Sequence, residues 1–507
     1  MDKSGESGKI GVTLDVVVFV CGGLVMIYEI IGSRILAPFI GTSTYVWTSL
    51  IGVILGALSL GYWLGGKAAD RKPDVKFLAT AILIASGLVS VTTISKEAVL
   101  SIIASMPMWL EFKALIAALV LFAPASVALG FVTPFAVRLR IASLGEAGKT
   151  VGRLYALSTV GSIAGTFAAG FVLLPFVGSV RTLYIIAGSL FVLSLILVPF
   201  SFKRTHAAVI TLLILGIAGS ELWRYTLYRA NDLLDIDTEY SRVQVFRAED
   251  RQTGRPIRTL SFDPLSTQSA MFLDGDELVF EYTKFYHLIR VLRPELGRTL
   301  MIGGAGYSFP KSYLAAYPGA TLDVVEIDPA MTRIAREHFR LTDDPRLRIE
   351  HTDGRLFLND AACSGYDAVL MDAFGTLFSV PFHLTTHEAV ASIYRCLNED
   401  GVVVFNLGSA IRGPASRFLQ AEFRTYQQVF PNVYLFKVRP ERSDDELQNL
   451  IIVACKRECL PGEANDPFTD SLLSRRFTDA FPLETPALTD DLAPVERYNS
   501  IAQAHSR

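Results

Sequence analysis

Long apolar runs fill the first 225 residues and constrain the fold of this chain more than any other feature. A helix needs roughly 17–25 apolar residues to cross a bilayer. Seven runs of about this length lie near residues 14–36, 44–65, 77–95, 113–137, 154–174, 181–200 and 206–223, and the last is the weakest. Only 19% of the whole chain is charged, whereas soluble chains carry about 25%. The sequence therefore predicts a multi-pass α-helical membrane domain over residues 1–224, with about seven spans.

Two further patterns describe this predicted bundle. The stretch 96–112 is amphipathic, so we expect it to lie at the membrane interface and not to cross it. Glycines four residues apart let helix backbones approach closely in lipid, which predicts a tight bundle. Such pairs are Gly52 with Gly56, Gly61 with Gly65, and Gly161 with Gly165.

Glu29 and Arg34 are ionisable residues in the first predicted span. Charged groups inside a bilayer are costly unless they are paired or meet water. A transport or substrate site is one interpretation. We favour the other, in which both lie near a helix end and pair with each other or with another span, because no other span has a charge at its centre.

Basic residues collect in alternate loops, and this pattern predicts the orientation of the helices. Loops rich in lysine and arginine lie on the cytoplasmic side. Here they are the loops that contain Lys67 to Lys76, Arg138 to Arg153, and Lys203 with Arg204. With seven spans, the rest of the chain would then emerge outside the cytoplasm. We expect instead that 206–223 does not cross and that the soluble part is cytoplasmic, for a reason given below.

From about residue 225 the pattern changes to alternating strands and helices. Short period-2 runs separated by turns predict a small antiparallel β-subdomain over 225–290. Strands at 298–304, 321–328, 346–351, 366–372 and 401–407 alternate with helices and predict a Rossmann-like α/β domain over 291–460. Residues 461–507 form a C-terminal extension.

Glycines and acids stand at the carboxyl ends of four successive predicted strands. In such sheets ligands bind at these ends. A glycine loop lets the backbone approach a ligand, and an acid about 20 residues later accepts hydrogen bonds from ribose hydroxyls. The residues are Gly303, Gly304 and Gly306, then Glu326, then Asp353 with Gly354, and then Asp372. One acid alone could cap a helix, as Asp353 could. Helix capping does not explain glycines or acids at four successive strand ends, so these residues together predict a nucleoside site.

These residues resemble a known family. The run 238–456 is similar to spermidine synthase, an aminopropyltransferase with a Rossmann-like methyltransferase fold, and most of all to bacterial membrane-bound members fused to helical spans. The segments 29–70, 152–178 and 372–389 also resemble that group. The resemblance implies that Glu326, Asp353 and Gly354 bind the nucleoside, and that Asp372 takes a proton from the attacking amine. It also implies a bacterial inner-membrane location.

The chain departs from the family where the amine groups should bind. Gly306 and Gly375 stand where the family has acids, and Tyr282-Thr283 replaces its Tyr-Gln or Tyr-His pair. Ammonium groups without a carboxylate cost several kcal/mol to desolvate. Glu281, Asp276, Glu277 or aromatic rings could substitute through charge or cation–π contact. The candidate residues for the amine side are Ser241, Tyr282, Thr283, Tyr307 and Gly375.

Three functions are compatible with these residues. The first is an aminopropyltransferase that uses decarboxylated S-adenosylmethionine as co-substrate and a small amine as acceptor. The second uses whole S-adenosylmethionine on another acceptor, and the third is a nucleoside sensor or transporter without catalysis. The resemblance favours the first. Because these donors are made in the cytoplasm, it also favours a cytoplasmic soluble domain. A homo-oligomer is compatible with all three.

Composition and cysteine spacing exclude other classes. The net charge of −3 gives no sign of a nucleic-acid partner. The cysteines form no CxxC pair and no metal-ligand spacing, so we expect no metal site and interpret them as ordinary thiols. They are Cys21, Cys363, Cys396, Cys455 and Cys459.

Overall fold

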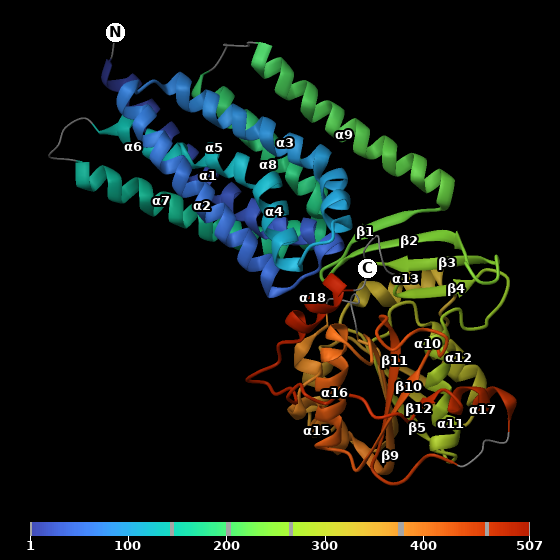
Figure 1. Ribbon diagram of the computed structural model, residues 1–507. Helices are drawn as coiled ribbons and strands as arrows, with labels where there is room; N and C mark the ends of the chain where they lie inside the picture. The colour runs from blue at the N-terminus through green and yellow to red at the C-terminus, as the bar shows by residue number, and fades with distance from the viewer. Residues whose placement is uncertain are drawn as a thin grey trace. The chain divides into compact units, whose positions relative to one another are not determined.

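A computed structural model describes residues 3–141, 147–198, 204–262, 267–373, 380–461 and 466–505. The chain divides into two compact units (Figure 1). The helical unit comprises Met1–Ala230 with Ile236–Arg242, and the soluble unit comprises Asn231–Asp235 with Val243–Arg507. The chain thus enters the soluble unit briefly, returns to the helical unit for a short segment, and then leaves it.

The helical unit is a bundle of long apolar helices. They are α1 (Lys3–Ile40), α2 (Thr44–Arg71), α3 (Val75–Ser105), α4 (Leu110–Leu121), α5 (Ala123–Gly130), α6 (Val132–Arg140), α7 (Ala147–Ala168) with its π-helical continuation η2 (Ala169–Val177), α8 (Ser179–Leu197) and α9 (Arg204–Asn231). In the described part of the chain, five helices are long and apolar enough to cross a membrane, and a sixth forms if the bent pair Leu110–Leu121 and Ala123–Arg140 counts as one. The helix α9 is apolar only over Thr205–Gly219. The stretch 96–112 is not a separate helix, because α3 continues to Ser105 and buries Lys96, and α4 begins at Leu110.

Glycines bring the helix backbones together at two of the three predicted pairs. A Cβ at Gly161 would lie 2.0 Å from the carbonyl oxygen of Phe19 in α1, and one at Gly165 would lie 2.3 Å from that of Gly23. A Cβ at Gly61 would lie 2.2 Å from the carbonyl oxygen of Val127, and one at Gly65 would lie 2.8 Å from the Cα of Phe131. These contacts confirm close packing at those pairs. By contrast, a Cβ at Gly52 or Gly56 would meet nothing within 4 Å.

A four-stranded sheet forms the first part of the predicted β-subdomain. Its order is β1-β2-β3-β4, made of β1 (Leu234–Asp237), β2 (Arg242–Glu249), β3 (Pro256–Ser261) and β4 (Ser269–Phe272). The strands β2, β3 and β4 pair antiparallel, as predicted. Three short helices follow and lead to the larger sheet: α10 (Glu281–Lys284), η3 (Phe285–Leu288) and α11 (Ile289–Leu292).

The larger sheet has eight strands in the order β12-β10-β11-β9-β8-β5-β6-β7. These are β5 (Arg298–Ile302), β6 (Thr321–Val325), β7 (Leu347–Glu350), β8 (Tyr366–Met371), β9 (Leu397–Ser409), β10 (Asn432–Lys437), β11 (Gln448–Cys455) and β12 (Arg476–Phe477). The five strands from β7 to β9 are parallel, and the remaining three pair antiparallel at one edge. This arrangement confirms the predicted Rossmann-like domain. The strand β12 comes from the C-terminal extension, which therefore completes the sheet.

The helices between and after these strands lie around the sheet (Figure 1). They are α12 (Ser308–Ala316), α13 (Pro329–His338), α14 (Gly354–Asn359), η4 (Phe382–Leu384), α15 (His387–Cys396), η5 (Pro414–Ser416), α16 (Arg417–Gln427), α17 (Pro467–Leu473) and α18 (Val495–His505). Apolar residues such as Leu300, Val369 and Val403 are fully buried between the layers. This burial fixes the strand register and aligns the strand ends that carry the candidate site.

The interpretation of four cysteines as ordinary thiols is wrong. Cys363 is bonded to Cys396 across 33 residues, and Cys455 is bonded to Cys459. The first pair forms because α14 packs on α15 and brings the two Cα atoms to 4.9 Å, which sequence spacing cannot reveal. The second forms where the chain turns after β11. Cys21, buried in α1, is free.

Candidate active site

The glycine loop after β5 is shaped by a close approach to the next strand end. Gly303 has a φ of +98°, and a Cβ there would lie 2.4 Å from the carbonyl oxygen of Asp372. A side chain would be both strained and blocked, so only glycine fits at this position. The loop therefore brings Gly303 directly against Asp372, the residue that follows β8.

Glu326 holds this loop from the end of β6. Its carboxylate accepts hydrogen bonds from the N–H groups of Gly304 (2.9 Å), Ala305 (3.0 Å) and Asp328 (3.0 Å). Burial raises the pKa of Glu326, and these three donors oppose the shift. A carboxylate offers about four acceptor positions, so one remains for a ligand.

Asp353 is a helix cap, as the sequence allowed. It accepts hydrogen bonds from the N–H groups of Arg355 (2.8 Å) and Leu356 (3.1 Å) at the start of α14. Its second oxygen lies 3.3 Å from His383 Nε2. Gly354 is packed tightly, because a Cβ there would lie 2.7 Å from Ile302.

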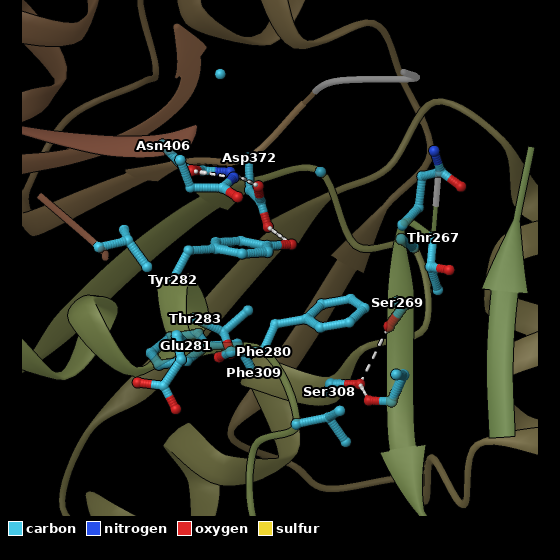
Figure 2. Close-up of a pocket in the computed structure, with 18 of the residues that line it drawn as sticks. Thr267, Ser269, Phe280, Glu281, Tyr282, Thr283, Ser308, Phe309, Asp372 and Asn406 are labelled. Carbon is cyan, nitrogen blue, oxygen red and sulfur yellow. Dashed lines mark hydrogen bonds between the residues drawn. The ribbon is translucent and has the colours of Figure 1, made fainter. Parts of the chain in front are cut away.

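Asp372 follows β8 and faces a cavity of about 490 Å³. Asn406 Nδ2 donates to its Oδ1 at 3.2 Å, and the Tyr282 hydroxyl lies 3.5 Å from its Oδ2. Figure 2 shows the Tyr282 ring beside the carboxyl group with its hydroxyl directed at it. Burial raises the pKa of Asp372 to about 7, although hydrogen bonds from these neighbours lower it. Near neutral pH this group can therefore gain or lose a proton, as a general base must.

The cavity combines aromatic walls with a few polar groups. Its described apolar lining includes Val279, Phe280, Phe309, Val380, Phe418 and Val438. Its polar lining includes Gln268, Ser269, Glu281, Asn406, Arg439 and Asn449. Glu281 is not a free carboxylate, because it pairs with Lys284 and lies 3.5 Å from Arg475. Among the described lining residues, Asp372 is the acid without a cationic partner.

The structure brings together only some of the predicted site residues. Gly303, Gly304, Tyr282, Thr283 and Asp372 line the cavity. Glu326, Asp353 and Gly354 lie at neighbouring strand ends but do not line it. Ser241 belongs to a turn in the helical unit, where its N–H donates to Thr238 Oγ1 at 2.9 Å. Gly375 lies outside the described residues.

Gly306 and Tyr307 have packing roles that the sequence did not predict. A Cβ at Gly306 would lie 2.4 Å from Ser269 Oγ in β4. Tyr307 is fully buried, and its hydroxyl lies 2.7 Å from Thr332 Oγ1. Its ring faces Gly304, where a Cβ would lie 2.7 Å from it. Tyr307, a candidate for the amine side, therefore does not line the cavity and offers no exposed ring to a cation.

Asn406 is the main residue that sequence reasoning missed. It lies in β9 and is itself held by Asn449 of β11, whose Nδ2 donates to its Oδ1 at 3.0 Å. The chain of bonds Asn449–Asn406–Asp372 orients the carboxyl group. The rule that ligands bind at strand ends, extended to the polar residue in GVVVFNL, could have found it.

Fold and site together define the class of this domain. A parallel sheet with a glycine loop after β5 and acids after β6, β7 and β8 is the Rossmann-like methyltransferase-type fold. Residues 280–439 match the family model described as Spermine/spermidine synthase domain. Residues 280–439 are thus similar to a spermine/spermidine synthase domain, and an N-terminal region of apolar helices precedes them.

Curated relatives support this. The chain is 28% identical over 232 residues to a polyamine aminopropyltransferase of Vibrio vulnificus, covering 44% of this chain and 74% of the relative. It is 24% identical over 440 residues to polyamine aminopropyltransferase 1 of Streptomyces coelicolor, covering 78% of this chain and 76% of the relative. It is also 28% identical over 196 residues to an N-terminal histidine N-methyltransferase of Emericella nidulans, covering 37% of this chain and 34% of the relative.

Proposed function

We propose that this chain is a membrane-anchored aminopropyltransferase. It transfers the aminopropyl group of decarboxylated S-adenosylmethionine to putrescine or a similar amine, and it yields spermidine and methylthioadenosine. The observation that carries the proposal is Asp372, a carboxyl group with a pKa raised to about 7 that faces the cavity beside the glycine loop. The apolar helices of the first unit support anchoring in a bacterial-type cell membrane.

Each residue then has a role in the transfer. The nitrogen of the neutral amine attacks the methylene carbon next to the sulfonium, and the carbon–sulfur bond breaks with its electron pair left on sulfur. Asp372 accepts the proton that the nitrogen loses. Asn406 and Tyr282 hold the carboxyl group in place. Gly303, Gly304 and Gly306 shape the loop beside the nucleoside, while Glu326, Asp353 and Gly354 bind it.

The nucleoside assignment is tested by calorimetry with methylthioadenosine. Glu326→Gln keeps the shape of the side chain but removes its charge and one acceptor, so we expect a loss of affinity of about tenfold or more. Glu350→Gln, at the end of the neighbouring strand β7, is the matched control. Unchanged affinity in a folded Glu326→Gln protein would remove Glu326 from the site.

The amine side is tested by restoring the acid that the resemblance assigns to position 375. Gly375→Asp should lower the Michaelis constant for putrescine, because a carboxylate stabilises the second ammonium group. Gly375→Asn, of equal size and no charge, should not. If both variants behave alike for every diamine, the acceptor is not a diamine.

A second candidate function is methyl transfer from whole S-adenosylmethionine. Arg439 lines the cavity, and a cation there suits the donor's carboxylate, while Gly306 removes the acid that would repel it. The by-product distinguishes the two reactions. Aminopropyl transfer releases methylthioadenosine and methyl transfer releases S-adenosylhomocysteine, which mass spectrometry separates after incubation with each donor.

A further inference from the structure

Basic residues gather at one end of the helical unit. They lie where α2 ends and α3 begins, where α6 ends and α7 begins, and at the start of α9. Ion pairs join these places: Asp15, near the start of α1, pairs with Arg140 and Arg153 at 2.7 Å each. Asp70 of α2 also lies 3.3 Å from Arg138 of α6. We call this the basic end. Its residues are Lys67, Arg71, Lys72, Lys76, Arg138, Arg140, Lys149, Arg153 and Arg204.

The chain leaves the helical unit from the opposite end. The segment Ile236–Arg242 belongs to this unit and precedes the soluble domain. The N–H of Ser179, the first residue of α8, donates to Asp237 Oδ2 at 2.8 Å. Arg34, near the end of α1, donates to the carbonyl oxygen of Thr238 at 3.1 Å and also to that of Glu239. Since α1 starts at the basic end and α8 finishes there, these contacts place the segment at the other end, which we call the exit end.

The helix α9 carries the chain between the two ends. The ring of His206, early in α9, lies 6.2 Å from that of Phe191, late in α8. Ten residues further, Gly216 packs against Tyr184, early in α8, and against Ile94 in α3, so that a Cβ there would lie 3.3 Å from each. The helix α9 therefore runs antiparallel to α8. Its 28 residues reach about 42 Å at 1.5 Å per residue, and the apolar stretch Thr205–Gly219 accounts for about 22 Å of the roughly 30 Å of a hydrocarbon core.

The composition of α9 fits a membrane span whose first part is apolar and whose last part lies at the boundary between membrane and water. Its apolar stretch Thr205–Gly219 is followed by the exposed rings of Tyr225 and Tyr228. Tyrosine is enriched at the boundary between membrane and water. Over its first half, from His206 to Gly216, α9 contacts α8 and α3, two helices that are long and apolar enough to cross a membrane. Counting α9 together with the five long apolar helices and the bent pair gives seven crossings in the described part of the chain, of which the first and the last end on the same side.

We propose that the soluble domain lies on the non-cytoplasmic side of the membrane. The basic end is cytoplasmic, because lysine and arginine are retained on that side. The exit end, from which Val243–Arg507 follows, is then outside the cytoplasm. This replaces the expectation of a cytoplasmic domain, which depended on a segment 206–223 that does not cross.

The disulfides support the same side independently. Both bonds, Cys363–Cys396 and Cys455–Cys459, lie in the soluble domain. Disulfides persist in oxidising compartments and are rare in the cytosol, where thiols are kept reduced. The one free cysteine, Cys21, lies in α1. The two disulfide bonds of the soluble domain are thus those expected of a domain outside the cytoplasm.

One consequence rests on the proposed function. A sulfonium donor carries a permanent charge and cannot cross the apolar core of a bilayer unaided. If aminopropyl transfer takes place outside the cytoplasm, a carrier-mediated export of the donor must precede it. The side of the membrane, however, can be measured without any activity.

The experiment labels single cysteines in the full chain with a membrane-impermeant maleimide, in intact bacterial cells and after lysis. Gln252→Cys places an exposed thiol on the soluble domain, and Lys72→Cys is the matched position at the basic end. Cys21 is buried and gives little background. We expect Gln252→Cys to react in intact cells and Lys72→Cys to react only after lysis.

A second readout uses reporters fused after Arg507. A phosphatase that is active only after export should be active there, and a fluorescent protein that matures only in the cytoplasm should stay dark. Labelling of Lys72→Cys but not Gln252→Cys in intact cells, or a fluorescent and phosphatase-negative fusion, would overturn the proposal. Loss of catalytic turnover would bear on the proposed function alone.

Discussion

Replacing Asp372 by asparagine should separate its catalytic role from its cost to stability. The carboxyl group has a pKa of about 7, against an ordinary value of 3.8, because burial disfavours its charge. As a base it is about one-tenth ionised at pH 6, half at pH 7 and nine-tenths at pH 8. Turnover should therefore rise through this range with a break near pH 7. Asp372→Asn should remove the break and lower turnover by about 10²–10⁴, with donor affinity nearly unchanged.

The same shift predicts an opposite effect on stability. A carboxyl group whose pKa is raised on folding favours the folded state below its unfolded pKa and loses this contribution as pH rises through the folded one. Three pKa units at 1.36 kcal/mol each give an upper limit of about 4 kcal/mol. Asp372→Asn stays neutral, so the variant should unfold at a higher temperature than the parent at pH 8 and at a similar temperature only near pH 3.5, below the unfolded pKa.

The assay combines pH–rate profiles with thermal unfolding of the detergent-solubilised chain at both pH values. Asp360→Asn, at an exposed position after α14, is the control and should change neither. The reasoning fails if Asp372→Asn keeps near-parental turnover. It fails equally if the variant is no more stable than the parent at pH 8, since burial would then not be the cause of the shift.

Three other changes test separate parts of the structure. Asn406→Leu removes the hydrogen bond that most lowers the pKa of Asp372, so the pH–rate break should move upward; a fixed break would show that Asn406 does not act on the carboxyl group. Gly161→Leu should prevent α1 from packing on α7 and lower the yield of folded protein, whereas Gly52→Leu, at an open position, should be tolerated. Cys363→Ser should lower the free energy of unfolding by about 3–4 kcal/mol, as expected for a loop closed across 33 residues, and a denaturation midpoint equal to the parent's would mean that the bond does not form.

Strand ends were predictable because hydrophobic runs and turns are local signals. The strands β5, β6 and β8 begin at the predicted residues, and so Glu326 and Asp372 fall at the predicted ends. The positions of Tyr307 and Gly306 were not predictable, because each depends on a contact with a residue far away in the sequence. Tyr307 turns inward to reach Thr332, and Gly306 lies against Ser269.

The disulfides and the return of segment Ile236–Arg242 to the helical unit were not predicted, for a related reason. Cys363 meets Cys396 only because α14 packs on α15, and spacing alone cannot say so. The return of Ile236–Arg242 to the helical unit depends on hydrogen bonds with Arg34 and Ser179. The charge of Arg34 near a helix end indicated that it needs a partner, but nothing in the sequence indicated that the partner is Thr238, and Ser179 carries no signal. Periodicity thus predicted the elements, but not the contacts made between distant parts of the chain.

The contact between Gly306 and Ser269 bears on how this lineage can change. A mutation that gives position 306 any side chain must first move Ser269, since the two would lie 2.4 Å apart. A lone Gly306→Asp mutant would therefore be selected against for its folding before any gain in amine binding could be felt. Ser269→Gly, occurring first, would open the route. An aspartate at position 306 thus needs a smaller residue than serine beside it at position 269.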